Sequence, residues 1–225
     1  MQTGETAFNY VHGVSLFEYL DQSPEAAKIF NANVASMTSR EAHALVNAYD
    51  FSSTLLLVYI GGGHGALTTA ILQMHPKTHA ILFDLPSIVE ETRRRLTIEG
   101  IADRCEVIGG NFFEAIPRGG DTYILKDVLH NWDDELATTI LRTCRQGLND
   151  SAKLLLIERV LIPGNDPMIG KLIDISMRIF TGGMERTAAE YSALLEAAGF
   201  QMKQIFPSDA ETSVIEAVPV IANTD

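Results

Sequence analysis

Cysteine, tryptophan and positive charge are all scarce in this sequence. Its 225 residues include two cysteines and one tryptophan, and 17 Lys and Arg stand against 29 Asp and Glu, for a net charge of -12. Nucleic acids and anionic membrane surfaces attract basic patches. The basic run "TRRRL" at 92–96 lies within an expected helix, so we expect neither nucleic acid nor a membrane as a partner.

Long hydrophobic runs and a secretion signal are lacking as well. No apolar run reaches the ~18 residues that a membrane helix requires, and "MQTGETAFNY" at the amino terminus has no basic start followed by an apolar stretch. Cys105 and Cys144 stand within apolar patterns without metal-ligand spacing. This predicts reduced thiols in the core, no bound metal and a cytoplasmic protein.

From residue 55 onward, short β-rich apolar runs alternate with helical patterns, which is typical of a parallel sheet wrapped by helices. The expected strands are 55–60, 80–84, 105–108, 122–127 and 153–160. Near the end, "QMKQIFP" and "TSVIEAVPV" flank a polar turn that would close a hairpin. They predict an antiparallel edge on the parallel sheet.

Helical periodicity gives the intervening helices an apolar face. In 64–74 it places Leu67, Ile71 and Met74 on one helical face, and in 133–147 it places Leu136 on the buried side. Residues 1–54 look helical throughout and predict a cap beside the sheet. We expect one globular catalytic unit over 55–225, because a chain of this length can bury a single core.

A glycine-rich loop follows the first strand, in "LLLVYIGGGHGAL" at 55–67. Glycines there let the backbone approach a ligand closely, and the next helix presents free N–H groups to it. Gly61, Gly63 and Ala66 match the pattern GxGxxA, and Asp84 ends the next strand about 20 residues on, where an acid binds ribose hydroxyls. This loop alone allows NAD, S-adenosylmethionine or a tight turn without a ligand.

Four further segments stand in a fixed order: "FDLPSIVEET", "GGNFFEAIPRGGDTYILKDVLHNWDDE", "LLLIERVLIP" and "TGGMERTAAEYSALLEAAGF". Together they resemble the S-adenosylmethionine-dependent O-methyltransferases of the caffeic acid and hydroxyindole type, from about residue 4 to the end. The resemblance implies a class I methyltransferase fold, which is Rossmann-like α/β, with a seven-stranded, mostly parallel sheet and an antiparallel last strand. It also implies methyl transfer from S-adenosyl-L-methionine to a hydroxyl of a small aromatic or polyketide-like molecule.

The same resemblance implies a catalytic histidine flanked by two acids. His130 matches the general base of the family, and an imidazole can take a hydroxyl proton near neutral pH. Glu158 and Glu185 match the acids that would orient the ring. The alternatives without a catalytic role are, for His130, a structural histidine at a strand–helix junction and, for Glu185, a solvated acid before the capping box that starts at Thr187.

Two binding pockets follow from the family match. The residues expected to bind the cofactor are Gly61, Gly63, Asp84, Leu85, Asn111, Phe112 and Lys126. The residues expected to line the acceptor pocket are Phe17, Phe30, Val34, Met37, Asn131 and Trp132. Plain packing is the alternative for the N-terminal members of this second set, because they fall at near-helical spacing, and a core position is the alternative for Trp132.

At two positions where the family usually has an acid, this sequence has another residue, Tyr59 and Asn111. Asn111 keeps an acceptor oxygen without the charge, whereas Tyr59 cannot replace a carboxylate at neutral pH. One lost charge-assisted hydrogen bond costs about 1.5 to 3 kcal/mol, or about ten- to a hundredfold in affinity. We therefore expect weakened cofactor binding. A non-methylating member that binds S-adenosylmethionine structurally, or supports a partner chain, is the second hypothesis, and an NAD-dependent oxidoreductase is the third.

Members of this family normally begin with a dimerisation domain of about a hundred residues. The resemblance here starts just after it. We therefore expect either a catalytic-domain fragment or a homodimer or partner chain that supplies the missing surface.

Overall fold

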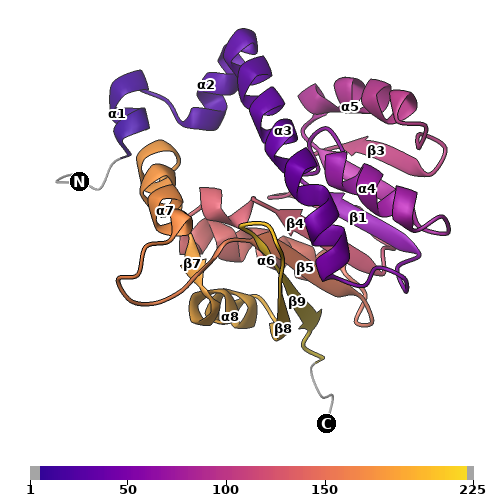
Figure 1. Cartoon of the computed structure of the whole chain (residues 1–225). Coiled ribbons are helices and arrows are strands. Elements are labelled where there is room, and N and C mark those ends of the chain that lie inside the picture. The colour runs from indigo at the N-terminus through magenta and orange to yellow at the C-terminus, as the bar shows by residue number, and fades with distance from the viewer. Residues whose placement is uncertain (1–5, 222–225) are drawn as a thin grey trace.

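The computed structural model describes residues 6–221 as a twisted sheet covered by helices on both faces (Figure 1). The seven strands are ordered β3-β2-β1-β4-β5-β9-β8. Their bounds are β1 (Leu56–Ile60), β2 (His79–Asp84), β3 (Cys105–Gly109), β4 (Thr122–Lys126), β5 (Lys153–Glu158), β8 (Phe200–Pro207) and β9 (Ser213–Pro219). The neighbours among β1 to β5 pair in parallel, and β9 is antiparallel to both β5 and β8.

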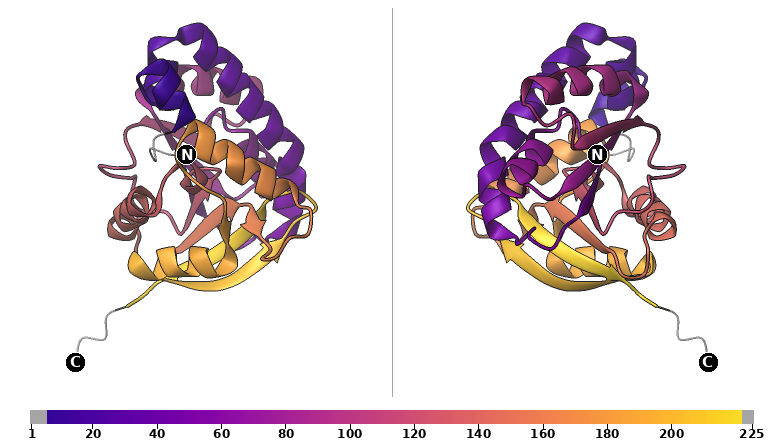
Figure 2. Two further views of the ribbon diagram at one scale, coloured as in Figure 1. Left: turned by 90° about the vertical axis from the view of Figure 1, so that its left-hand side faces the viewer. Right: turned by 90° about the vertical axis from the view of Figure 1, so that its right-hand side faces the viewer.

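This sheet confirms the expected fold class, with one refinement. The predicted hairpin forms, but its second strand, β9, is inserted between β5 and β8, so that β8 alone occupies the edge. Figure 2 shows the N-terminal helices at one end of the molecule and this hairpin at the other.

Helices cover the two faces in separate groups. The described helices are α1 (Ala7–His12), α2 (Leu16–Gln22), α3 (Pro24–Ala48), α4 (Ala66–Met74), α5 (Pro86–Ile98), α6 (Asp134–Gly147), α7 (Ile169–Phe180) and α8 (Ala188–Ala197). Residues of α6 and α8 pack with Val58 and Ile60 of β1, whereas residues of α3, α4 and α5 pack with Leu57 and Tyr59. Strand β1 is thus buried on both faces, as parallel strands usually are.

One predicted buried position is wrong, because Leu136 is 39% exposed. Met74, predicted to share a helical face with the fully buried Leu67, is 49% exposed. Each of these two side chains lies in a terminal turn of its helix. At these ends, the helices extend beyond the part of the sheet that they cover.

The N-terminal region is helical as expected, and it bridges two parts of the molecule. The C-terminal half of α3 joins the core through Leu45 and Val46. The short helix α1 lies beside α7, away from the sheet (Figure 1). Cys105 and Cys144 are buried free thiols, as predicted. Within 6–221, no helix is both long enough and apolar enough to cross a membrane.

Candidate functional site

The glycine loop lies where the strand order reverses. Strand β1 is followed on one side by β2 and β3 and on the other by β4 and β5. Ligands of such sheets bind at this switch point, beyond the carboxyl ends of the strands. Gly61 follows β1, Asp84 ends β2, and Asp127 follows β4, so the parallel pairing brings these positions to one edge of the sheet.

The loop after β1 requires glycine for its backbone conformation. Gly61, Gly63 and Gly65 have φ values of 68°, 54° and 78°, which disfavour other residues. The carbonyl oxygen of Gly63 accepts a hydrogen bond from Oγ1 of Thr92 at 2.8 Å. A Cβ atom built at Gly63 would meet nothing within 4 Å. The loop is therefore held by Thr92 on one side and leaves open space beside Gly63.

Asp84 ties this loop to the end of β2. Its Oδ2 accepts from the backbone N–H of Gly63 and its Oδ1 from that of Leu85, both at 2.7 Å. Burial raises the pKa of Asp84, and these two hydrogen bonds oppose the rise. Each carboxylate oxygen retains acceptor capacity for a ligand hydroxyl. Leu85 is 47% exposed beside it.

The remaining predicted cofactor residues differ in their exposure and in the partners they already have. Asn111 is exposed, its Oδ1 accepts from the backbone N–H of Phe113 at 3.0 Å, and its Nδ2 donates to Glu114 at 3.1 Å. Phe112 is half-buried, with its ring centroid 5.0 Å from that of Phe113. Lys126 is buried and pairs with Glu41 of α3 at 3.0 Å, so its ammonium group already has a partner.

Tyr59 points into the core. It is 3% exposed and belongs to the cluster between the sheet and α3 and α4. The loop passes over its ring, because a Cβ atom built at Gly62 would lie 3.2 Å from Cδ1 of Tyr59. Burial, followed by the charges of Asp127 and Asp84, raises the pKa of Tyr59 well above its usual value. Its hydroxyl therefore stays neutral.

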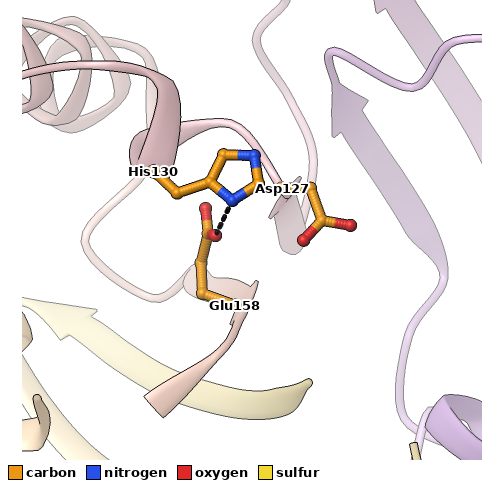
Figure 3. Close-up of side chains that lie close together, drawn as sticks. All are labelled: Asp127, His130 and Glu158. Atoms are coloured by element: carbon orange, nitrogen blue, oxygen red, sulfur yellow. Dashed lines mark ion pairs between the residues drawn. The ribbon is translucent and has the colours of Figure 1, made fainter. Parts of the chain in front are cut away.

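The three predicted catalytic side chains meet just beyond β4 and β5. His130 lies in a short 3-10 turn, η1 (Leu129–Asn131). Its Nδ1 is 3.0 Å from Oε1 of Glu185 and 3.8 Å from Oε2 of Glu158. A carboxylate can only accept, so in the neutral imidazole Nδ1 carries the hydrogen and Nε2 has the free lone pair. Figure 3 shows the ring between Glu158 and Asp127.

Glu158 is anchored by the backbone that carries the histidine. Its Oε1 accepts from the N–H groups of Val128 and Leu129, at 3.0 and 2.9 Å. Glu158 is 0% exposed and Glu185 is 3% exposed. Glu185 is therefore a buried partner of His130, and the alternative of a solvated loop acid is wrong.

Burial and charge oppose each other at His130. Burial favours the neutral ring, but the negative charge of Glu158, the hydrogen bond to Glu185 and the charge of Asp127 outweigh it, and the pKa of His130 rises to about 9. Burial raises the pKa of Glu158 to about 7, against the opposing effect of His130. The site therefore stabilises an imidazolium ion.

Two charged residues of the site were missed in the sequence. Asp127 has a φ of 51°, the one positive value outside glycine among residues 6–221, and forms ion pairs with Lys126 and with Arg159, the latter at 3.2 Å. Arg159 is 3% exposed and also lies 3.8 Å from Glu185. Their places directly after β4 and β5, at the carboxyl edge of the sheet, were the available signal.

A metal ion could in principle use part of this cluster. One ligand atom each from Asp127, His130 and Glu158 lie within 4.8 Å of one another. However, Asp127 already pairs with two cations, and Nδ1 of His130 faces Glu185. The arrangement favours an ion-pair network, and the absence of a metal stays a prediction.

Aromatic rings adjoin the histidine. Phe17 of α2 stacks on Trp132, with centroids 5.5 Å apart and planes at 22°. Phe113 meets Trp132 edge-on, with centroids 4.9 Å apart. Nδ2 of Asn131 donates to the carbonyl oxygen of Asp127 at 3.1 Å, which occupies its amide nitrogen. The other predicted members lie on α3, where Phe30 and Met37 are half-buried and Val34 is exposed.

Comparison with known proteins decides the family. The model of the O-methyltransferase domain matches residues 1–201. The chain belongs to this O-methyltransferase family. The phenazine O-methyltransferase PhzM of Lysobacter antibioticus is 43% identical over 220 residues, which cover 98% of this chain and 64% of that relative.

Solved structures of the family have the same architecture. The crystal structure of LaPhzM, at 43% identity, has a TM-score of 0.95 and is matched over 97% of this chain and 66% of its own. NcsB1, an O-methyltransferase from neocarzinostatin biosynthesis, has a TM-score of 0.89 at 29% identity, over 97% of this chain and 66% of its own. It was solved with S-adenosyl-L-homocysteine and 1,4-dihydroxy-2-naphthoic acid.

Proposed function

We propose that this chain transfers the methyl group of S-adenosylmethionine to a hydroxyl of a small aromatic or polyketide-like molecule, with His130 as general base. The observation that carries the proposal is the buried His130, with Nδ1 held 3.0 Å from Glu185 and 3.8 Å from Glu158, beside a glycine loop at the switch point. A relative named as a phenazine O-methyltransferase, and the dihydroxynaphthoic acid bound in the structure of NcsB1, support this class of acceptor. A homodimer or partner chain stays a prediction.

The residues of the switch point fit the cofactor. The open space beside Gly63 would admit the amino-acid end of S-adenosylmethionine. The Asp84 carboxylate, fixed by two backbone N–H groups, would accept hydrogen bonds from the ribose hydroxyls of the cofactor. Leu85 and Phe112 would border the adenine. When bound, S-adenosylmethionine supplies an electrophilic methyl group on a sulfonium.

The proposed reaction needs one proton acceptor from the protein. Nε2 of the neutral His130 would take the hydroxyl proton of the acceptor as the acceptor oxygen bonds to the methyl group. The bond from that methyl group to the sulfonium would break, and the thioether S-adenosylhomocysteine would leave. Nδ1–H remains donated to Glu185, and the charge of Glu158 stabilises the imidazolium that results. The rings of Phe17 and Trp132 would hold an aromatic acceptor beside the base.

Transfer of a labelled methyl group from S-adenosylmethionine to a panel of hydroxylated phenazines, dihydroxynaphthoic acids and simple phenols tests this proposal. We expect O-methylation of at least one compound. Binding of S-adenosylmethionine without transfer to any of them would favour the non-methylating hypothesis instead.

Asp84→Asn is expected to weaken S-adenosylmethionine binding about ten- to a hundredfold, which corresponds to about 1.5 to 3 kcal/mol. Both carboxylate oxygens accept backbone N–H groups, so the amide nitrogen of asparagine would face a donor. Calorimetric titration measures the change. Asp103→Asn, at an exposed turn before β3, is the matched control and should bind as the wild type does.

Glu185→Gln is expected to move the ascending limb of the pH profile of kcat/KM to lower pH. The base must be neutral, and His130 becomes neutral only as the pH rises through its pKa of about 9. Because the hydrogen bond to Glu185 raises that pKa, its weakening lowers the pH at which the base form appears. An unshifted limb would argue against the pair, and the exposed Glu106→Gln provides the control.

Removal of metal ions is expected to leave turnover unchanged. The oxygens of Asp127 already pair with Lys126 and Arg159, and proton acceptance by a histidine needs no Lewis acid. Turnover is compared before and after dialysis against EDTA. Loss of activity that a divalent cation restores would show that Asp127, His130 and Glu158 hold a metal.

A further inference from the structure

Arg186 is a fully buried cation to which the proposed reaction gives no role. It begins the short strand β7 (Arg186–Thr187), which pairs in parallel with β6 (Val160–Leu161). Its side chain is 0% exposed and is among the largest of the fully buried side chains. A buried guanidinium is costly unless its donors are paired, so its partners indicate what it holds in place.

All five N–H donors of this guanidinium are used. Nε and Nη2 donate to the same oxygen of Asp134, at 3.0 and 2.9 Å. Nη2 also donates to the carbonyl oxygen of Trp132 at 2.8 Å. Nη1 donates to the carbonyl oxygens of Leu129 and Met184, at 3.1 and 3.2 Å.

The three carbonyl groups belong to the two segments that form the base site. Leu129 and Trp132 lie on either side of His130, and Met184 directly precedes Glu185. One planar group with fixed donor directions therefore spans both segments. The contact between Nδ1 of His130 and Glu185, at 3.0 Å, joins the same two segments.

We propose that Arg186 is a positioning residue, which holds Glu185 against Nδ1 of His130 and so keeps Nε2 directed at the acceptor hydroxyl. Asp134, in the first turn of α6, supplies its counter-charge. The inference rests on the proposed role of His130 as the base. An arginine that only stabilised the fold would leave the protonation of His130 unchanged, which makes the two roles separable.

Arg186→Lys tests this role. Lysine keeps the charge, but its single ammonium group cannot span both segments. We expect kcat to fall about a hundredfold, as for a small misplacement of a catalytic group, with the Kd for S-adenosylmethionine within about threefold of wild type. We also expect a lower pKa of the His130 imidazole, measured by NMR titration. A wild-type His130 pKa in a folded Arg186→Lys variant would overturn the proposal.

Arg104→Lys is the matched control. Arg104 directly precedes β3, at the edge of the sheet opposite the site, and also donates to backbone carbonyl groups, those of Leu72, His75, Pro76 and Thr78. This variant should lose stability without a change in kcat or in the pKa of His130. Equal losses of kcat in the two lysine variants would show that Arg186 acts through stability, and would also overturn the proposal.

A second variant covers the case in which Arg186→Lys does not fold. Asp134→Ala removes the counter-charge from a side chain that is 68% exposed, and should lower kcat about tenfold and lower the pKa of His130. Glu135→Ala, the neighbouring first-turn acid of α6, is its control. Identical behaviour of these two variants would overturn the proposal. Because NMR titration needs no turnover, a wild-type chain that transfers no methyl group refutes the proposed function and leaves this test intact.

Discussion

His130→Ala is expected to lower kcat by about 10² to 10⁴ and to leave the affinity for S-adenosylmethionine unchanged. The imidazole offers a free Nε2 while Nδ1 is held by Glu185, and alanine offers no proton acceptor. Glu158 and Glu185 cannot replace it directly, because both carboxylates are buried on the Nδ1 side of His130. Steady-state kinetics with a phenol that the wild-type chain methylates measure the effect on kcat. Calorimetric titration with S-adenosylmethionine measures the effect on affinity separately.

His79→Ala is the control for this variant. His79 lies at the amino end of β2, is exposed, and should keep kcat within about twofold of wild type. Turnover of His130→Ala at the level of this control would remove His130 from the base role. Loss of cofactor binding in His130→Ala would instead indicate that the turn η1 had moved, and the kinetic result would then say nothing about the base.

Gly183→Ala is expected to disrupt the base site by displacing backbone. A Cβ atom at Gly183 would lie 2.1 Å from the carbonyl oxygen of His130, 2.4 Å from the carbonyl carbon of Asn131 and 2.6 Å from the backbone nitrogen of Trp132. Backbone atoms cannot rotate away as the end of a side chain can. We expect a loss of about 3 kcal/mol in the free energy of unfolding and a fall of about a hundredfold in kcat.

Gly170→Ala makes the same change in α7 and serves as the comparison. There the nearest atom to a new Cβ is the tip of the Leu161 side chain, at 3.0 Å, which can move. Helix propensity also favours alanine over glycine. Denaturant unfolding and turnover should both remain near wild type, and a Gly183→Ala variant that matched it would contradict the packing of the Gly183 loop on the His130 turn.

The fold could be predicted from the sequence because its signals are local. Continuous apolar runs specify buried parallel strands, and helical patterns between them specify crossovers. The insertion of β9 between β5 and β8 has no local signal, since it depends on which edge the hairpin meets. Met74 and Leu136 followed the periodicity of their helices, yet are exposed, because periodicity does not show where the sheet ends.

The candidate site was predictable where the sequence resembles a family and much less so elsewhere. His130, Glu158 and Glu185 were chosen by resemblance, and their side chains meet in the structure. Asp127 offered only its place after β4 as a signal, and Arg186 offered little, because their partners Arg159 and Asp134 are distant in the sequence. The packing of Tyr59 into the core was equally hidden. The run around Tyr59 is apolar throughout, so the sequence does not show which face of the sheet each side chain meets when both faces are buried.

Calorimetric titration of the chain with S-adenosylmethionine, S-adenosylhomocysteine and NAD identifies the ligand of the glycine loop most directly. The loop and Asp84 predict micromolar binding of both adenosyl ligands, weakened because Tyr59 supplies no carboxylate, and no binding of NAD. Binding of NAD alone, or of none of the three, would contradict the proposed site and the reaction built on it.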